Sequence, residues 1–126
     1  LFSNALPPVI AAAALQAVNL VAQGDDLRTR LQDNAAFFRS QLTALGFRLV
    51  PGNHPIIPVM LGDATLATSM ADRLLRESVY VVGFSFPVVP KGQARIRVQM
   101  SAAHTRAQLK QAVGAFQKVG RELGVI

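Results

Sequence analysis

The chain has 126 residues, of which 51% are hydrophobic and 16% charged, a balance typical of one globular domain that buries a single core. It contains no cysteine, and its two histidines and seven acidic residues are not clustered, which argues against disulfides and a metal site. The formal net charge of +6 favours an anionic partner, but thirteen scattered basic residues with one tyrosine and no tryptophan do not predict nucleic-acid binding.

The first predicted helix follows Pro7-Pro8, a pair suited to the start of a helix, and ends before Gly24. Its side chains are apolar on nearly all sides, which predicts burial on all sides. The apolar run is interrupted by Gln16 and Asn19 and is too short to span a membrane. We therefore expect polypeptide outside this chain, or a partner subunit, to cover this helix.

A second helix is predicted to begin at Asp25 or Asp26, either of which can act as its N-cap, and to end at Gly46. Its apolar residues recur at spacings of three and four: Leu27, Leu31, Ala35, Phe38, Leu42 and Leu45. The polar residues between them, including Arg28 and Arg39, are expected to form a solvated face.

The remainder of the chain is predicted to alternate short strands with helices. Strands are expected at residues 47–50, 56–61, 79–84 and 94–100. Asp63 can cap one helix, and Thr105-Arg106-Ala107-Gln108 matches the capping box of another. Pro58 implies a bulge or an unpaired edge position in its strand. This order predicts an α+β fold: a mainly antiparallel sheet of about four strands with helices packed on one face, preceded by two helices.

The most informative segment of the chain is 87–105, in which a loop with two prolines and a glycine leads into a strand. Because side chains alternate along a strand, Arg95, Arg97 and Gln99 are expected on one face. The opposite face then carries Ala94, Ile96, Val98 and Met100. Two guanidinium groups on one face suit a carboxylate or a phosphate, since the planar fork pairs bidentately with either. The alternative is a basic face that is simply solvated.

No nucleophile, general base or cofactor anchor is evident in the sequence. His104, just before a predicted helix, is expected to be a structural histidine rather than a general base, and His54 lies in a turn without an assigned role. Lys110 and Lys118 are expected to be solvated on an amphipathic helix, whereas Lys91 could meet an anion. The residues alone therefore predict a chain that recognises an anion and catalyses nothing by itself.

Three stretches resemble the α-oxoamine synthases, which are pyridoxal-phosphate enzymes of the aspartate aminotransferase fold type. They are Phe2–Pro8, Ile56–Asp63 and, above all, Val89–Thr105. The resemblance extends over essentially the whole chain and corresponds to the C-terminal end of such an enzyme. It implies that residues 1–24 form an interdomain and interface helix segment, and that residues 25–126 form an α+β small domain.

The resemblance also implies which residues form the site. The lysine that binds pyridoxal phosphate would lie outside this chain, so no catalytic residue, covalently bound cofactor or metal is expected here. Arg97 would clamp the carboxylate of the amino-acid substrate, and Arg95 would be a structural or helper charge. Phe2 and Ser3 match the family segment that reaches the cofactor phosphate of the neighbouring subunit in a homodimer.

The activity implied by the resemblance is the condensation of glycine with acetyl-CoA to give 2-amino-3-ketobutyrate and CoA. The full enzyme would be a cytoplasmic homodimer that binds neither nucleic acid nor membrane, and the isolated chain would be inactive. Two alternatives remain open. One is another α-oxoamine synthase, of the 8-amino-7-oxononanoate or 5-aminolevulinate synthase type; the other is a freestanding basic module that binds an anion or nucleic acid.

Overall fold

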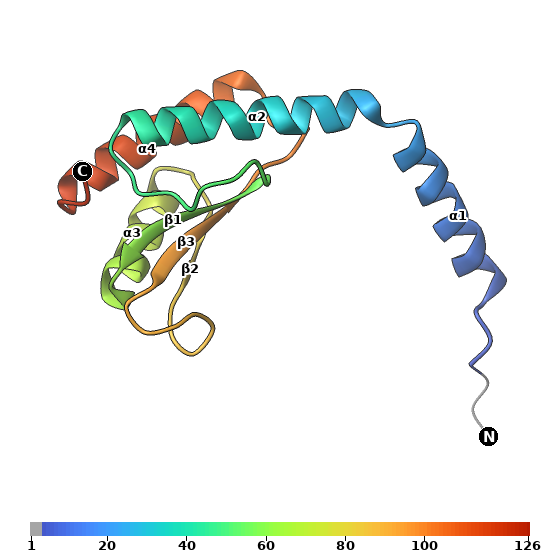
Figure 1. Ribbon diagram of the computed structural model, residues 1–126, viewed down its shortest axis with the longest axis horizontal. Coiled ribbons are helices and arrows are strands. Elements are labelled where there is room, and N and C mark those ends of the chain that lie inside the picture. Colours follow the sequence, from blue (N-terminus) through green and yellow to red (C-terminus); the bar gives the residue numbers. More distant parts are fainter. Residues whose placement is uncertain (1–3) are drawn as a thin grey trace.

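A computed structural model describes residues 4–126 of the chain; Leu1, Phe2 and Ser3 lie outside the described residues. The elements in chain order are α1 (Pro8–Ala22), α2 (Asp25–Ala44), β1 (Ile56–Gly62), α3 (Ala64–Arg76), β2 (Val82–Phe84), β3 (Ala94–Gln99) and α4 (Arg106–Glu122). The helices α2, α3 and α4 cover one face of a small antiparallel sheet, whereas α1 projects away from it (Figure 1). The predicted α+β architecture is therefore confirmed.

The sheet has three strands in the order β1-β3-β2, all antiparallel, instead of about four. The first predicted strand is reduced to one isolated bridge between Leu49 and Val59, because the chain turns away at Pro51. The third is shorter than predicted and begins only at Val82. Its expected first residue, Val79, instead donates its N–H to the carbonyl of Leu74 at the end of α3 (2.9 Å).

Pro58 lies in β1, an edge strand of the sheet, as its position in the sequence predicted. Its carbonyl accepts the N–H of Val50 at 3.2 Å and therefore points away from β3. The ring nitrogen of Pro58 points the same way, since N–H and C=O of one strand residue share a side. The absent N–H of Pro58 is therefore on the outer edge of β1, where no hydrogen bond to β3 is lost. A bulge lies further along the strand, between Met60 and Gly62.

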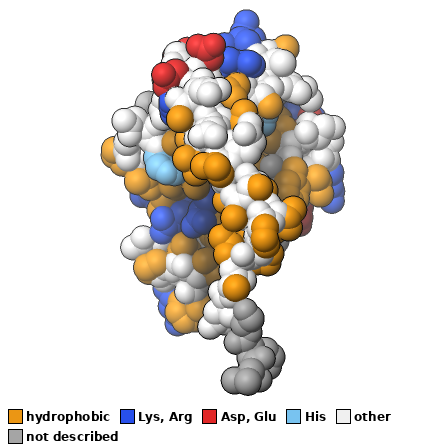
Figure 2. All heavy atoms as spheres, turned by 90° about the vertical axis from the view of Figure 1, so that its right-hand side faces the viewer, with side chains coloured by type: hydrophobic (Ala, Val, Ile, Leu, Met, Phe, Trp, Pro, Cys, Tyr) orange, Lys and Arg blue, Asp and Glu red, His pale blue; other side chains and the backbone are white. Residues whose placement is uncertain are grey.

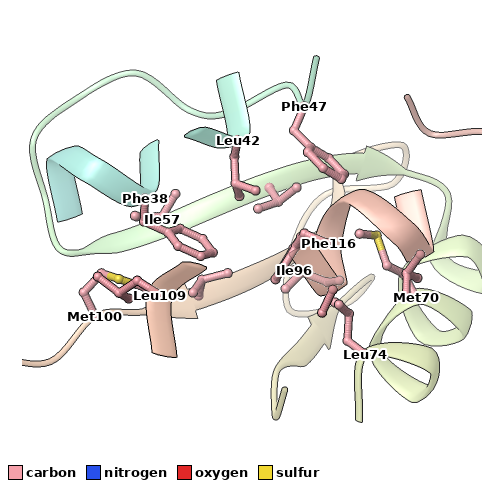
Figure 3. Packing of buried hydrophobic residues seen from close by; sticks show 14 of the residues in the cluster. Phe38, Leu42, Phe47, Ile57, Met70, Leu74, Ile96, Met100, Leu109 and Phe116 are labelled. Atoms are coloured by element: carbon pink, nitrogen blue, oxygen red, sulfur yellow. The ribbon is translucent and has the colours of Figure 1, made fainter. Parts of the chain in front are cut away.

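The core lies between the sheet and its three helices (Figure 3). Phe116 of α4 is fully buried and meets Phe38 of α2 edge-to-face, with ring centroids 5.8 Å apart. The buried face of β3 carries Ala94, Ile96 and Val98, as the alternation predicted. The predicted caps of α3 and α4 are confirmed. Asp63 accepts the N–H of Leu66 at 2.7 Å, and Thr105 with Gln108 forms the capping box of α4.

The beginning of α2 differs from the prediction. Gly24 is its N-cap, and neither Asp25 nor Asp26 makes a side-chain cap; Asp25 instead forms an ion pair with Arg28. Leu27, predicted on the apolar stripe, is 56% exposed. The prediction was wrong here because the first turn of α2 extends beyond the sheet, so the core does not cover Leu27 (Figure 1).

None of the residues of α1 is buried in this chain, although the helix is strongly apolar. Its exposed large side chains are Val9, Ile10, Leu15, Val18, Leu20 and Val21. Figure 2, turned so that α1 faces the viewer, shows these hydrophobic side chains gathered along the helix. The described chain thus leaves α1 uncovered, and its cover by polypeptide outside this chain or by a partner subunit stays a prediction.

Candidate functional site on the open face of the sheet

The open face of the sheet is the side away from the three helices, and no helix of residues 4–126 packs on it (Figure 1). In β3, Ala94, Ile96 and Val98 point into the core, so Arg95 and Arg97 point to the open face. Arg97 is exposed and Arg95 half-buried. The sequence prediction that the two arginines share one face, opposite the apolar residues, is confirmed.

Arg97 occupies the middle of this face. Its register partners are Pro58 on β1 and Val82 on β2. The guanidinium carbon of Arg97 lies 4.2 Å from the ring centroid of Phe84, which is on β2. Arg97 makes no hydrogen bond or ion pair with any residue of 4–126. All of its N–H groups are therefore free to bind an anion.

Arg95 is placed differently although it lies only two residues away. Its Nε donates to the carbonyl of Gln93 at 3.0 Å, and its Nη2 donates to the side-chain oxygen of Gln93 at 3.2 Å. These bonds occupy part of the guanidinium fork and hold Arg95 against the loop before β3. Arg97 is thus the better placed of the two to receive a carboxylate, and Arg95 fits a structural role.

A hollow of about 330 Å³ lies beside Arg97 on the open face. It is lined by Arg39, Val50, Pro51, His54, Ile56, Pro58 and Arg97. Two of these residues are arginines and none is acidic, so the hollow presents positive charge. A small anion is the ligand that this electrostatic environment favours.

Arg39, predicted to be solvated, is instead half-buried and organises the wall of this hollow. Its guanidinium donates to the backbone carbonyls of Val50 and His54, each at 2.9 Å, and to that of Ile56 at 3.3 Å. Its Nε is buried without a partner. The sequence carried a signal for this position: Arg39 follows Ala35 by four residues, so it borders the apolar stripe of α2.

The two histidines have structural roles in the described chain. His104 accepts the N–H of Ser101 on its Nδ1 at 3.2 Å, which closes the turn before α4. His54 accepts the N–H of Ile56 on its Nδ1 at 3.0 Å and stabilises the turn before β1. No hydrogen bond joins either imidazole to a hydroxyl or amino group of a side chain in residues 4–126. For His104 this agrees with the structural interpretation made from the sequence, which assigned no role to His54.

The three lysines do not provide a site for pyridoxal phosphate. A lysine that reacts with a carbonyl needs a lowered pKa, which burial or a neighbouring cation supplies. The pKa of Lys118 is raised instead, because its exposed ammonium group bonds to the Glu77 carboxylate at 2.6 Å. Lys91 lies 5.2 Å from the ring centroid of Phe86 in an exposed loop, and Lys110 is exposed on α4. Residues 4–126 therefore do not fit the cofactor by themselves.

Phe2 and Ser3, predicted to reach a cofactor phosphate, lie outside the described residues. Within residues 4–126, no group of three or more His, Cys, Asp or Glu side chains could hold a metal ion. None of the helices in that range combines the length and hydrophobicity needed to cross a lipid bilayer.

A second hollow, of about 390 Å³, lies between α4 and the segment before β2. Its walls include Tyr80, His104, Gln108 and Phe116, and no arginine, lysine, aspartate or glutamate lines it. It offers an anion no charged partner, and Arg97 does not line it. The open face of the sheet is therefore the stronger candidate site.

The family model for aminotransferase class I and II matches residues 1–116 of this chain. The chain therefore belongs to the aminotransferase class I and II family. Two solved structures share its fold along its full length. The chain superimposes with a TM-score of 0.91 and 35% identity on a high-resolution structure of SPT with PLP, covering 32% of it. It superimposes with a TM-score of 0.82 and 31% identity on 8-amino-7-oxononanoate synthase from Francisella tularensis, covering 36% of it.

The curated relatives are more similar still. The whole chain is 56% identical to 2-amino-3-ketobutyrate coenzyme A ligase of Escherichia coli strain K12 and covers 32% of that protein. It is 47% identical to the mitochondrial protein of the same name from Bos taurus, covering 30% of it. It is 46% identical to 8-amino-7-oxononanoate synthase of Symbiobacterium thermophilum, again covering 32%. The chain thus spans about a third of the length of the relatives that it matches.

Proposed function

We propose that this chain is the C-terminal domain of a longer pyridoxal-phosphate-dependent acyltransferase that condenses glycine with acetyl-CoA to give 2-amino-3-ketobutyrate and CoA. The similarity to 2-amino-3-ketobutyrate coenzyme A ligase along all 126 residues supports this assignment. In the longer protein, residues 1–24 form the interdomain and interface segment, and residues 25–126 form the small domain.

The observation that carries the proposal is the position of Arg97 and its free hydrogen-bond donors. Its guanidinium has free N–H groups, and it stands on a sheet face that no helix of residues 4–126 covers. In the complete enzyme the large domain closes over this face, and Arg97 binds the carboxylate of glycine. A bidentate pair of this kind fixes the orientation of the amino acid as well as its affinity.

The cofactor belongs to the part of the enzyme outside this chain. Pyridoxal phosphate supplies the electron sink for chemistry at the α-carbon of glycine, and the protein contributes binding and orientation. The lysine that holds the cofactor is outside residues 1–126. Phe2 and Ser3 are proposed to approach the cofactor phosphate of the partner subunit.

The exposed apolar surface of α1 supports a covered position in the assembly. Six large apolar side chains of one helix remain in water in the isolated chain, and soluble proteins seldom leave such a surface open. The proposed cover is the large domain together with a second subunit, which makes the enzyme a homodimer. A cytoplasmic location is also part of this proposal.

The test is a change of Arg97 to Ala in the longer protein. Loss of the charge-assisted pair costs about 1.5–3 kcal/mol, or about 3–5 kcal/mol if the carboxylate stays buried without a partner. This corresponds to a fall of about ten-fold to a few thousand-fold in kcat/KM for glycine. Arg121→Ala on the exposed side of α4 is the matched control. An unchanged kcat/KM in Arg97→Ala would remove this residue from the proposed role.

A second candidate is 8-amino-7-oxononanoate synthase activity, which the 46% identity to the Symbiobacterium protein favours. The two activities differ in the amino acid and in the acyl thioester, but both use a carboxylate clamp. Turnover with a longer acyl-CoA but not with acetyl-CoA would move the assignment to this candidate. Salt-dependent binding of nucleic acid with no acyltransferase activity would instead favour the freestanding basic module.

A further inference from the structure

Phe84 lies next to Arg97 on the open face of the sheet. It is on β2, where its register partner in β3 is Arg95, so its side chain is on the same face as both arginines. Arg97 reaches diagonally across the strand pair, and its guanidinium carbon lies 4.2 Å from the centroid of the Phe84 ring. This separation is well inside the range of a cation–π contact.

A cation–π contact takes up none of the hydrogen bonds that a guanidinium can donate to an anion. The N–H bonds of an arginine lie in the guanidinium plane, and a carboxylate binds bidentately within that plane. The ring of Phe84 can therefore hold Arg97 without using the donors that a substrate needs. Arg95, in contrast, is held by hydrogen bonds to Gln93, which occupy part of its N–H groups.

On the side of the hollow, the surroundings of Arg97 do not attract its positive charge. Arg39 borders the same hollow and carries the same charge. The backbone carbonyls of Val50, His54 and Ile56 accept hydrogen bonds from Arg39, and none of them accepts one from Arg97. Among residues 4–126, the Phe84 ring is the one partner that the structure gives to Arg97.

We propose that Phe84 is a positioning residue, which stacks on Arg97 and holds the guanidinium edge toward the substrate carboxylate. The inference rests on the proposed function, which supplies glycine as that substrate. Without the ring, the long side chain of Arg97 samples more rotamers, and ordering it again reduces the binding of glycine.

The test uses the longer protein loaded with pyridoxal phosphate. Phe84→Leu keeps an apolar side chain of similar size but removes the aromatic face, whereas Phe84→Tyr keeps the face. Losing a cation–π contact of ordinary strength raises KM for glycine by roughly 2- to 30-fold. We expect kcat to change much less and Phe84→Tyr to restore KM. Titration with glycine alone, followed by cofactor absorbance, should show the same weakening without turnover.

Phe37 provides a matched control, since Arg106 lies over its ring at 4.0 Å from the centroid. This second stack joins α2 to α4 on the helix side of the chain. Phe37→Leu should therefore lower thermal stability and leave KM for glycine unchanged. An equal rise of KM in Phe37→Leu and Phe84→Leu would indicate general loosening of the fold and overturn the proposal.

A double-mutant cycle separates this inference from the proposed function. If Phe84 acts through Arg97, Phe84→Leu should have no further effect on KM in an Arg97→Ala background. If Arg97→Ala raises KM and Phe84→Leu does not, the stacking proposal is wrong and the carboxylate clamp stands. If Arg97→Ala leaves glycine binding unchanged, Arg97 does not bind the carboxylate, and the proposed role of Phe84 is wrong as well.

Discussion

Asn34 of α2 donates its side-chain amide to the backbone carbonyl of Ser101 at 3.0 Å, across 67 positions of the sequence. The same Nδ2 also donates to the carbonyl of His104 at 3.0 Å. Asn34 is only 7% exposed, so both bonds are shielded from water. They fix the segment after β3 to α2 and thereby fix the end of the strand that carries Arg97.

Asn34→Ala should destabilise the chain, because it removes both hydrogen bonds that the buried Asn34 amide donates to the half-buried residues Ser101 and His104. We expect a loss of about 1–3 kcal/mol in the free energy of unfolding, measured by urea denaturation. Gln32→Ala on the exposed side of the same helix is the control and should change stability by less than about 0.5 kcal/mol. Equal stability of the two variants would contradict the structural role of Asn34.

Arg39→Gln should loosen the wall of the hollow beside Arg97. The change removes the donors that reach three backbone carbonyls in residues 50–56, and a glutamine is too short to replace them. We expect a loss of about 1–3 kcal/mol in stability and faster hydrogen exchange of the amides in residues 50–56. Arg30→Gln, exposed on the same helix, should show neither effect. Unchanged exchange in Arg39→Gln would show that the turn is held by other contacts.

The parts of this chain that follow from local rules could be predicted from the sequence. Asp63 and Thr105 cap their helices because their oxygens reach backbone N–H groups within three residues. The burial of Ile96 and the exposure of Arg97 follow from the alternation of a strand with one covered face. The proposed role of Arg97 came from the resemblance, since alternation alone also allowed a solvated basic face.

The parts that depend on distant segments could not be predicted in this way. Leu27 fits an apolar stripe, but it is exposed because the sheet ends before it. Arg39 bonds to carbonyls 11 to 17 positions away, which no spacing along α2 reveals. Phe84 meets Arg97 through strand pairing, so the contact depends on a register that the sequence leaves open.

Gly120 of α4 packs against the Phe47 ring so closely that a side chain has no room. A Cβ atom at this position would lie 2.6 Å from Cζ of Phe47 and 3.1 Å from Ile126. Gly120→Ala should therefore destabilise the chain by about 1–3 kcal/mol, despite the better helix propensity of alanine. Gly114 lies on the same helix with open space around it, and Gly114→Ala should stabilise the chain by up to about 1 kcal/mol. Thermal unfolding of the two variants should shift in opposite directions; two shifts of the same sign would contradict the close packing at Gly120.

The apolar surface of α1 should make the isolated 126-residue chain associate with itself. Leu15 and Val18 are 64% and 65% exposed, and pairing two such helices would remove their side chains from water. Replacing both with Lys adds charge to this surface, so sedimentation velocity should show a monomer at concentrations where the unchanged chain forms larger species. Leu75→Lys is the control, because it removes a comparably exposed leucine (57%) from α3 and should leave self-association intact. In the longer protein, the same two α1 substitutions should weaken the subunit or domain contact. A stable assembly with unchanged activity would mean that α1 is not part of that contact.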